Sequence, residues 1–245
     1  MITSVQFSET ADIETSSDGY ATRFAGGVGK WFLNVQEQAT LRMLAPYPGA
    51  TVLDVGGGHG QMTGALVARG FDATVVGSDP LCAKRIQPYL DARRCSFEVG
   101  DMLNLPYKDK SFGVVISYRL LPHVTQWERF LGELCRVAEK AVIIDYPEHN
   151  SANAFVPYLF GFKKSLEGNT RQYTNYRRAD LLRAFRDHGF IYGESYAQYF
   201  VPMVIHRKLQ APTISDRMER VCRKLGLTRR WGSPIILKMI REGAL

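Results

Sequence analysis

Four glycines stand within five positions in the stretch TVLDVGGGHGQ, which covers residues 51–61. They follow an apolar run that contains one carboxylate, Asp54. Fixing a glycine backbone costs conformational entropy, so a cluster of glycines indicates that something approaches the backbone closely there. Two further carboxylates, Asp79 and Asp101, follow the next apolar runs. A loop of this kind, bordered by carboxylates, suits a ligand that carries positive charge.

The apolar runs that hold these residues alternate with helical patterns. Buried strands are predicted at residues 51–57, 73–79, 95–101 and 140–147, and another begins at residue 112. Helices are predicted at residues 61–70, 80–92 and 127–138, with one over residues 30–47 ahead of the first strand. Strands and helices that alternate with short connections predict a parallel sheet covered on both faces. The expected fold class is therefore α/β, doubly wound.

The pattern is less regular after residue 147. Residues 150–175 are expected to form an insertion, followed by an amphipathic helix over residues 177–190. The remaining segments are interpreted as a strand over residues 193–209, a helix over residues 215–225 and a last strand over residues 232–240. We expect a single domain over residues 1–245, with a helical cap at 1–48, a core at 49–147, the insertion, and the end of the sheet at 176–245.

Composition limits the kind of protein. The 245 residues are 45% hydrophobic and include no apolar run of the roughly 18 residues needed to cross a bilayer. The first residues lack the profile of a secretory signal, so we expect a cytoplasmic protein. The four cysteines, Cys82, Cys95, Cys135 and Cys222, form no CxxC pair, and we expect neither a metal site nor disulfides.

Positive charge is concentrated in the last third of the chain. Residues 161–245 hold 17 Lys and Arg against 7 Asp and Glu, whereas the whole chain has a net charge of +7. This balance is compatible with an anionic substrate, a nucleic acid, a transient contact with a membrane surface, or a solvated basic face.

The glycine stretch decides between two kinds of cofactor loop. A dinucleotide fingerprint requires G-x-G-x-x-G, and Gln61 stands where its third glycine belongs. The pattern from Asp54 to Gly60, D-x-G-x-G-x-G, resembles motif I of class I S-adenosylmethionine-dependent methyltransferases of the type 11, UbiE-like group. The resemblance continues in order to residue 146. It implies a mostly parallel seven-stranded sheet with helices on both faces and a lid insertion after strand five.

The resemblance also implies a cofactor, S-adenosylmethionine, and a set of residues that bind it. Asp54 would hold the methionine amino group, Asp79 the ribose hydroxyls and Asp101 the adenine amino group. The remaining cofactor contacts would come from Tyr20, Arg23, Gly56, Gly58, Gly60, Met102 and Ser117. Gly57 and His59 depart from the commonest family pattern, but both positions act mainly through backbone.

The acceptor side of the site is expected after the fourth strand, in SYRLLPHV. His123 is the candidate general base or acceptor contact, with a capping role in the loop as the alternative. Tyr118 and Arg119 complete the catalytic candidates, with Tyr118 expected to shape the cofactor pocket. Further candidates are His206 and the pair Tyr173 and Tyr176, and the 150–175 lid adds the aromatic, basic segment FVPYLFGFKK.

These observations favour a methyltransferase acting on a hydrophobic or phenolic small molecule, at oxygen in preference to nitrogen or carbon. Three alternatives stay open: an RNA or lipid methyltransferase that uses the basic third, a nicotinamide-dependent oxidoreductase, and a non-catalytic subunit that binds the cofactor. Asp145 stands where metal-dependent catechol methyltransferases could place a ligand, but no partner ligands are identifiable. The sequence does not indicate the oligomeric state.

Overall fold

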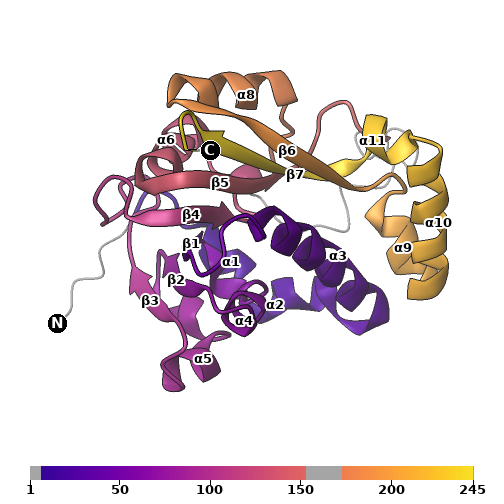
Figure 1. The fold of residues 1–245 in the computed structure, drawn as a ribbon. Helices are drawn as coiled ribbons and strands as arrows, with labels where there is room; N and C mark the ends of the chain where they lie inside the picture. The colour runs from indigo at the N-terminus through magenta and orange to yellow at the C-terminus, as the bar shows by residue number, and fades with distance from the viewer. Residues whose placement is uncertain (1–6, 153–172, 245) are drawn as a thin grey trace.

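The computed structural model describes residues 7–152 and 173–244 and contains one seven-stranded sheet (Figure 1). The strands stand in the order β3-β2-β1-β4-β5-β7-β6. Their bounds are β1 Thr51–Val55, β2 Asp72–Gly77, β3 Ser96–Val99, β4 Phe112–Ser117, β5 Ala138–Tyr146, β6 Phe190–Tyr199 and β7 Ser233–Arg241. Strands β1 to β5 are mutually parallel, and β7 runs antiparallel to both β5 and β6. The doubly wound, mostly parallel sheet is thus confirmed.

Two cores cover the two faces of the sheet. On one face, helices α6 (Trp127–Val137) and α8 (Arg178–Asp187) pack through Phe130, Leu134 and Phe185. On the other face, α3 (Gly26–Leu44) and α4 (Thr63–Ala68) pack through side chains that include Met43 and Leu66. Every residue of β4 is buried, as expected for a central strand that is covered on both sides.

Two predicted elements differ from the structure because of prolines. The helix expected over residues 80–92 is a 3₁₀ turn, η3 (Pro80–Ala83), followed by α5 (Gln87–Asp91) with Pro88 in its first turn. The strand expected over residues 193–209 is wrong in its second half: β6 ends at Tyr199, and α9 (Met203–Leu209) begins directly after Pro202. The lid predicted at residues 150–175 lies largely outside the described residues.

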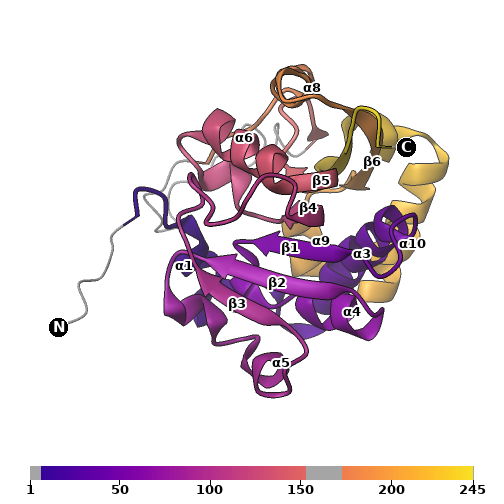
Figure 2. The same ribbon diagram turned by 60° about the vertical axis from the view of Figure 1, so that its left-hand side comes forward.

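The first described residues form short helices ahead of the sheet. They are α1 (Ala11–Thr15), α2 (Asp18–Ala21) and the 3₁₀ turn η1 (Thr22–Phe24). Figure 2 shows α1 beside the arrowheads of β1 and β2. The segment ahead of the first strand is therefore helical, and α1 lies at the carboxyl edge of the parallel strands.

The end of the chain adds a separate helical layer. It consists of α9, α10 (Pro212–Lys224) and α11 (Leu227–Trp231). A third, small core of Val28, Phe32 and Tyr199, with Met203 packed against it, joins α9 to α3 and to the end of β6. This layer therefore flanks the same end of the sheet as the N-terminal helices.

Candidate functional site

The glycine stretch lies at the carboxyl end of β1 and makes a tight turn. Gly56 and Gly60 have φ values of 74° and 69°, which favour glycine, and the 3₁₀ turn η2 (Gly57–His59) lies between them. A Cβ atom on Gly58 would lie 2.5 Å from the carbonyl oxygen of Cys82 and from the hydroxyl of Ser16. The glycines therefore let the N-terminal segment and the loop after β2 approach the end of β1.

Asp54 occupies the fourth position of β1 and is completely buried. Among the described residues, neither of its carboxylate oxygens has a hydrogen-bond partner, and the carboxyl group fills the space that a Cβ atom on Gly57 would need. Burial raises the pKa of Asp54 to about 7, while the charge of Arg119 lowers it slightly. A buried carboxylate without partners is energetically costly, and a ligand cation would satisfy it. The ammonium group of S-adenosylmethionine fits this requirement.

Asp79 and Asp101 follow the carboxyl ends of β2 and β3, which are neighbours in the sheet. Asp79 accepts a hydrogen bond from the Leu81 amide (2.8 Å), and Asp101 accepts one from the Leu103 amide (2.9 Å). Each carboxylate thereby fixes its own turn and, among the described residues, keeps its second oxygen unengaged. Leu81 is 69% exposed next to Asp79. An apolar surface beside two carboxylates suits a purine nucleoside.

Arg119 contacts several residues at this edge. Its backbone has a φ of 58°, and its amide donates to Oδ1 of Asp145 at 2.6 Å. The guanidinium lies 3.3 Å from Nδ1 of His59, donates to Gln61, and lies over the ring of Phe24.

Tyr20 joins the same group, because the guanidinium of Arg119 lies 5.8 Å from the centre of its ring. Arg23 lies 4.9 Å from the ring of Tyr20 but is exposed. Three predicted residues are thus brought together at the end of β4. His59 and Asp145 also contact Arg119, although sequence reasoning gave neither of them a role in binding the cofactor. Burial raises the pKa of Asp145 to about 6.

Asp12 is a site residue that sequence reasoning missed. It lies on α1, is completely buried, and accepts hydrogen bonds from the Ser78 amide (2.6 Å) and the Ser78 hydroxyl (2.5 Å). The thiol of Cys82 adds a third contact at 3.3 Å. Asp12 therefore fastens the N-terminal segment next to Asp79. The surrounding sequence is polar and has no periodicity, so only the three-dimensional structure identifies this contact.

Three other predicted residues are engaged inside the protein. The hydroxyl of Tyr118 is 2.6 Å from that of Thr40, and the side chain is only 1% exposed. Tyr118 therefore packs inside the protein, and the role expected for it in shaping the cofactor pocket stays a prediction. Ser117 donates its hydroxyl to the Val55 carbonyl (2.9 Å), and Met102 is buried in the core on the α6 side.

His123 ends the 3₁₀ turn η4 (Leu121–His123) after β4. Its ring meets that of Tyr173 edge to face, with 5.5 Å between the centroids. The chain on the far side of the predicted lid is tied to the same turn, because the Thr174 amide donates to the Pro122 carbonyl and the Tyr176 hydroxyl donates to the Leu121 carbonyl. Sequence reasoning grouped Tyr173 and Tyr176 with the site, and the structure places both beside the turn that carries His123.

His206 lies elsewhere. It is completely buried, and its Nε2 is 3.1 Å from Glu219 of α10. Its ring packs against Trp31 and Phe32. His206 therefore holds α9 against α10 and α3, and we assign it no contact with the acceptor.

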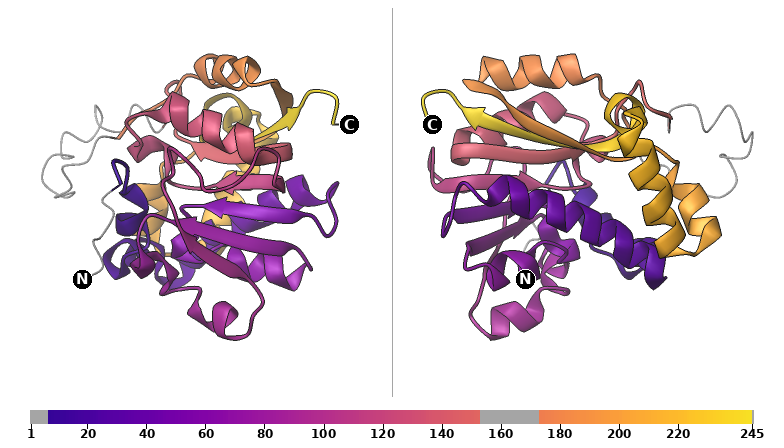
Figure 3. Two further views of the ribbon diagram at one scale, coloured as in Figure 1. Left: turned by 90° about the vertical axis from the view of Figure 1, so that its left-hand side faces the viewer. Right: turned by 45° about the vertical axis from the view of Figure 1, so that its right-hand side comes forward.

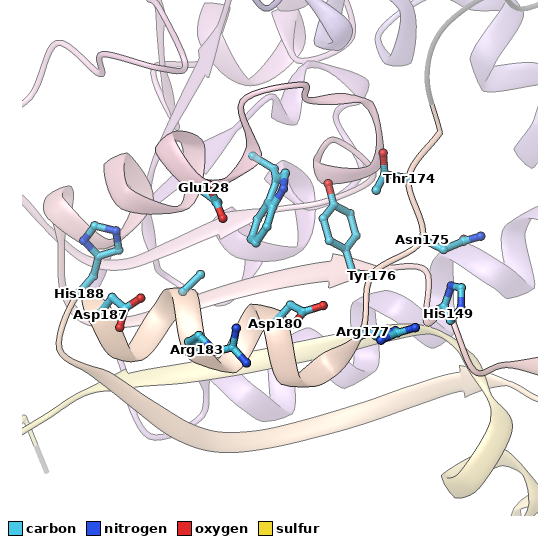
Figure 4. A pocket seen from close by; sticks show the side chains of 12 residues that line it. Glu128, His149, Thr174, Asn175, Tyr176, Arg177, Asp180, Arg183, Asp187 and His188 are labelled. Carbon is cyan, nitrogen blue, oxygen red and sulfur yellow. The ribbon is translucent and has the colours of Figure 1, made fainter.

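A cavity of about 750 Å³ lies on the other side of the Tyr176 segment, between α6 and α8 (Figure 4). Its lining includes Trp127, Tyr176, three carboxylates and two arginines. None of Asp54, Asp79 and Asp101 lines it. This cavity is therefore separate from the sheet edge that carries the predicted cofactor residues.

The described part of the chain offers neither a cluster of metal ligands nor a membrane-spanning helix. No group of three or more His, Cys, Asp or Glu side chains is arranged to hold a metal ion in residues 7–152 and 173–244. No helix in the same ranges has the length and apolarity that a bilayer crossing needs.

Comparisons with known proteins agree with this geometry. Residues 53–144 match the model of a methyltransferase domain. The chain is 35% identical over 104 residues to ajmaline N-methyltransferase of Rauvolfia serpentina, covering 40% of this chain and 35% of that protein. It is 33% identical over 102 residues to demethylmenaquinone methyltransferase of Roseiflexus sp., covering 40% and 42%. The chain thus spans well under half the length of these curated relatives.

A similar solved structure is magnesium protoporphyrin IX methyltransferase of Synechocystis with bound S-adenosylhomocysteine. The TM-score is 0.66 and the identity 17%, covering 95% of this chain and 98% of that one. At this identity the likeness supports the fold. The matched stretch includes the glycine motif and the ends of β1 to β4, so it favours a methyltransferase over the nicotinamide-dependent alternative. Residues 53–144 thus match a methyltransferase domain, and the whole chain has the fold of a solved methyltransferase that binds S-adenosylhomocysteine.

Proposed function

We propose that this protein transfers the methyl group of S-adenosylmethionine to a small, largely apolar acceptor. The observation that carries the proposal is Asp54, a buried carboxylate without a partner, at the glycine turn and beside Arg119. A site of this kind is complete only with a cation in it. The cofactor supplies an electrophilic methyl group on its sulfonium when bound.

The chain's own residues bind and orient the two substrates. Asp54 would take the ammonium of the methionine part, and Arg119, with Tyr20 above it, would take the carboxylate. Asp79 and Asp101 would hold the ribose and adenine, each with the oxygen that its turn leaves unengaged. Fixing the cofactor from both ends sets the direction of the methyl group, and orientation of this kind supplies a large share of the rate in a displacement reaction.

The acceptor would lie beside His123, at the turn after β4. The similar proteins are named for ajmaline, demethylmenaquinone and magnesium protoporphyrin IX, which are all ring systems. Tyr173 and Arg119 add an aromatic ring and a cation to the same edge. We propose a hydrophobic or phenolic acceptor methylated on oxygen, with His123 removing the hydroxyl proton.

Calorimetric titration with S-adenosylhomocysteine tests the cofactor assignment. We expect binding at one site per chain, no binding of NADH, and at least about tenfold weaker binding for Asp79→Ala, because a hydroxyl-to-carboxylate hydrogen bond is lost. Asp72→Ala is the matched control, since Asp72 is an exposed carboxylate at the opposite end of β2. The proposal fails if S-adenosylhomocysteine does not bind, or if both variants bind it as the unmodified protein does.

A further inference from the structure

Helix α10 is attached to the domain by polar contacts. The carboxylate of Glu219 accepts hydrogen bonds from the amides of Phe200 (2.9 Å) and Val201 (2.8 Å). The guanidinium of Arg223 donates to the carbonyls of Ala197 and Gln198 at the end of β6. The side of the helix that faces the protein is therefore its polar side, which reverses the usual arrangement of a surface helix.

A stripe along one exposed flank of α10 is apolar. Ile214, Val221 and Leu225 are 48%, 56% and 69% exposed, and they follow one another at helical spacing with Met218 between them. Helix α9 adds exposed apolar residues next to it, namely Val204, Ile205 and Leu209. We call these seven apolar residues along α9 and α10 the outer face. Among the large hydrophobic side chains that are exposed in the described ranges, more than half belong to α9, α10, α11 or their connections.

Positive charge surrounds the outer face. Residues 203–231 contain eight Lys and Arg and only two acids, Asp216 and Glu219. Glu219 is buried in its hydrogen bonds, and Asp216 pairs with Arg220. Within the residues that the structure describes, no carboxylate pairs with Lys208, Arg217 or Lys224. The outer face thus combines exposed apolar side chains with uncompensated cations.

We propose that the outer face docks on the surface of a bilayer that contains anionic phospholipids. An interfacial helix needs an apolar stripe to enter the headgroup region and cations to meet the lipid phosphates, and α10 presents both. Two copies of this face would bring like charges together. A nucleic acid would leave the apolar stripe in water.

The position of the outer face gives such docking a consequence for the site. Figure 3 shows α9 and α10 beside the first turns of α3, where Gly27 meets the ring of Pro212. The charge of Arg207 on α9 reaches the phenol of Tyr20, which also feels Arg119 and Asp145. Helices α9 and α10 therefore border the edge proposed for the acceptor. Docking would bring that edge to the bilayer, where an apolar acceptor accumulates.

Vesicle sedimentation with the full chain tests the proposal without requiring methyl transfer. We expect binding to vesicles of 70% phosphatidylcholine and 30% phosphatidylglycerol at 0.1 M salt, and little binding to pure phosphatidylcholine. The double variant Arg217→Gln, Lys224→Gln should bind about 25-fold more weakly, because each cation near an anionic surface contributes about fivefold. Val221→Ser with Leu225→Ser should weaken binding by at least about tenfold, because apolar burial is lost.

Matched variants outside the outer face control for total charge and for folding. Arg69→Gln with Lys108→Gln removes the same charge from exposed positions elsewhere, and should bind as the unmodified protein does. All variants should bind S-adenosylhomocysteine normally. The proposal is overturned if the full chain does not bind anionic vesicles, or if control and outer-face variants weaken equally. It is also overturned if the outer-face variants bind vesicles normally but abolish a dimer that light scattering detects. The same holds if they bind vesicles normally but lose binding to bulk tRNA.

Discussion

Asp54 and Asp145 are buried carboxylates that share one cation, because the charge of Arg119 lowers the pKa of both. Burial has the larger effect and raises the pKa of Asp54 to about 7 and that of Asp145 to about 6. One guanidinium cannot fully compensate two carboxylates in a poorly solvated place. A second positive group is therefore favoured there, and the proposed ammonium of the cofactor supplies it.

The shifted pKa of Asp54 predicts how stability depends on pH. Because the folded-state pKa lies above the unfolded value of 3.8, the folded protein holds a proton that the unfolded chain has lost. The contribution of Asp54 to stability is therefore present at low pH and is lost as pH rises through about 7. Relative to Asp54→Asn, the unmodified protein should lose about 2.5 kcal/mol of unfolding free energy between pH 5 and pH 8.

Urea denaturation of both proteins at the two pH values measures this difference. Asp72→Asn, at the exposed start of β2, is the control and should show no such change. Saturating S-adenosylhomocysteine should reduce the loss in the unmodified protein, because an ammonium beside Asp54 favours its charged form. A difference between Asp54→Asn and the unmodified protein that is the same at both pH values would contradict the interpretation.

His123 predicts a different signature. If it removes a proton from the acceptor, His123→Gln should lower kcat by roughly 10² or more with little effect on the affinity for S-adenosylhomocysteine. His188→Gln is the control, because His188 lies at the end of α8, on the side of the large cavity. Turnover on an identified acceptor gives the answer, and full activity in His123→Gln would remove the proposed role.

At the scale of elements, most of the sheet was predictable from sequence because its central strands are buried on both faces. FGVVIS therefore has an almost continuous apolar pattern, and VLDV has one that only Asp54 interrupts. The second half of the segment 193–209 was not predictable in this way, because VPMVIHRKL is as apolar as a strand and only Pro202 marks the change to a helix. The order of Asp54, Asp79 and Asp101 along the chain predicted the cofactor edge.

The N-terminal helices could not be placed from sequence, since their attachment depends on hydrogen bonds between distant residues. Asp12 and Ser78 are 66 positions apart, and no local pattern joins them. The same holds for Arg119, whose left-handed backbone is fixed by Asp145 of the next strand. The residue types at the site were thus readable, whereas the contacts between them required the folded structure.

The attachment of α1 leads to a prediction about Asp12. Asp12→Ala would leave the buried amide and hydroxyl of Ser78 without their acceptor, and should lower the free energy of unfolding by roughly 1–3 kcal/mol. Asp18→Ala is the control on the same segment, because its ion pairs with Lys84 and Arg85 are exposed, and its effect should be much smaller. Urea denaturation measures both, and equal effects would show that Asp12 does not fasten the segment.

For the whole molecule, the three cores meet on a single sheet, and the N-terminal and C-terminal helices both flank its carboxyl edge. A ligand held by residues from Tyr20 to Asp101 therefore contacts elements that come from separate parts of the chain. We expect binding there to stabilise the fold as a unit. If residues 1–245 form a single domain, as predicted, they should unfold together on heating.

We expect one cooperative thermal transition that shifts upward with S-adenosylhomocysteine. A ligand at 100 times its Kd adds about 2.7 kcal/mol to the folded state, which for a domain of this size raises Tm by roughly 5–10 °C. NADH at the same concentration is the control and should not shift Tm, because Gln61 replaces the third glycine of a dinucleotide site. Scanning calorimetry measures both. Two separate transitions, with only one shifted by the ligand, would contradict the single domain. They would mean that the ligand-binding residues belong to one of two independently unfolding units, because a ligand stabilises only the unit that binds it.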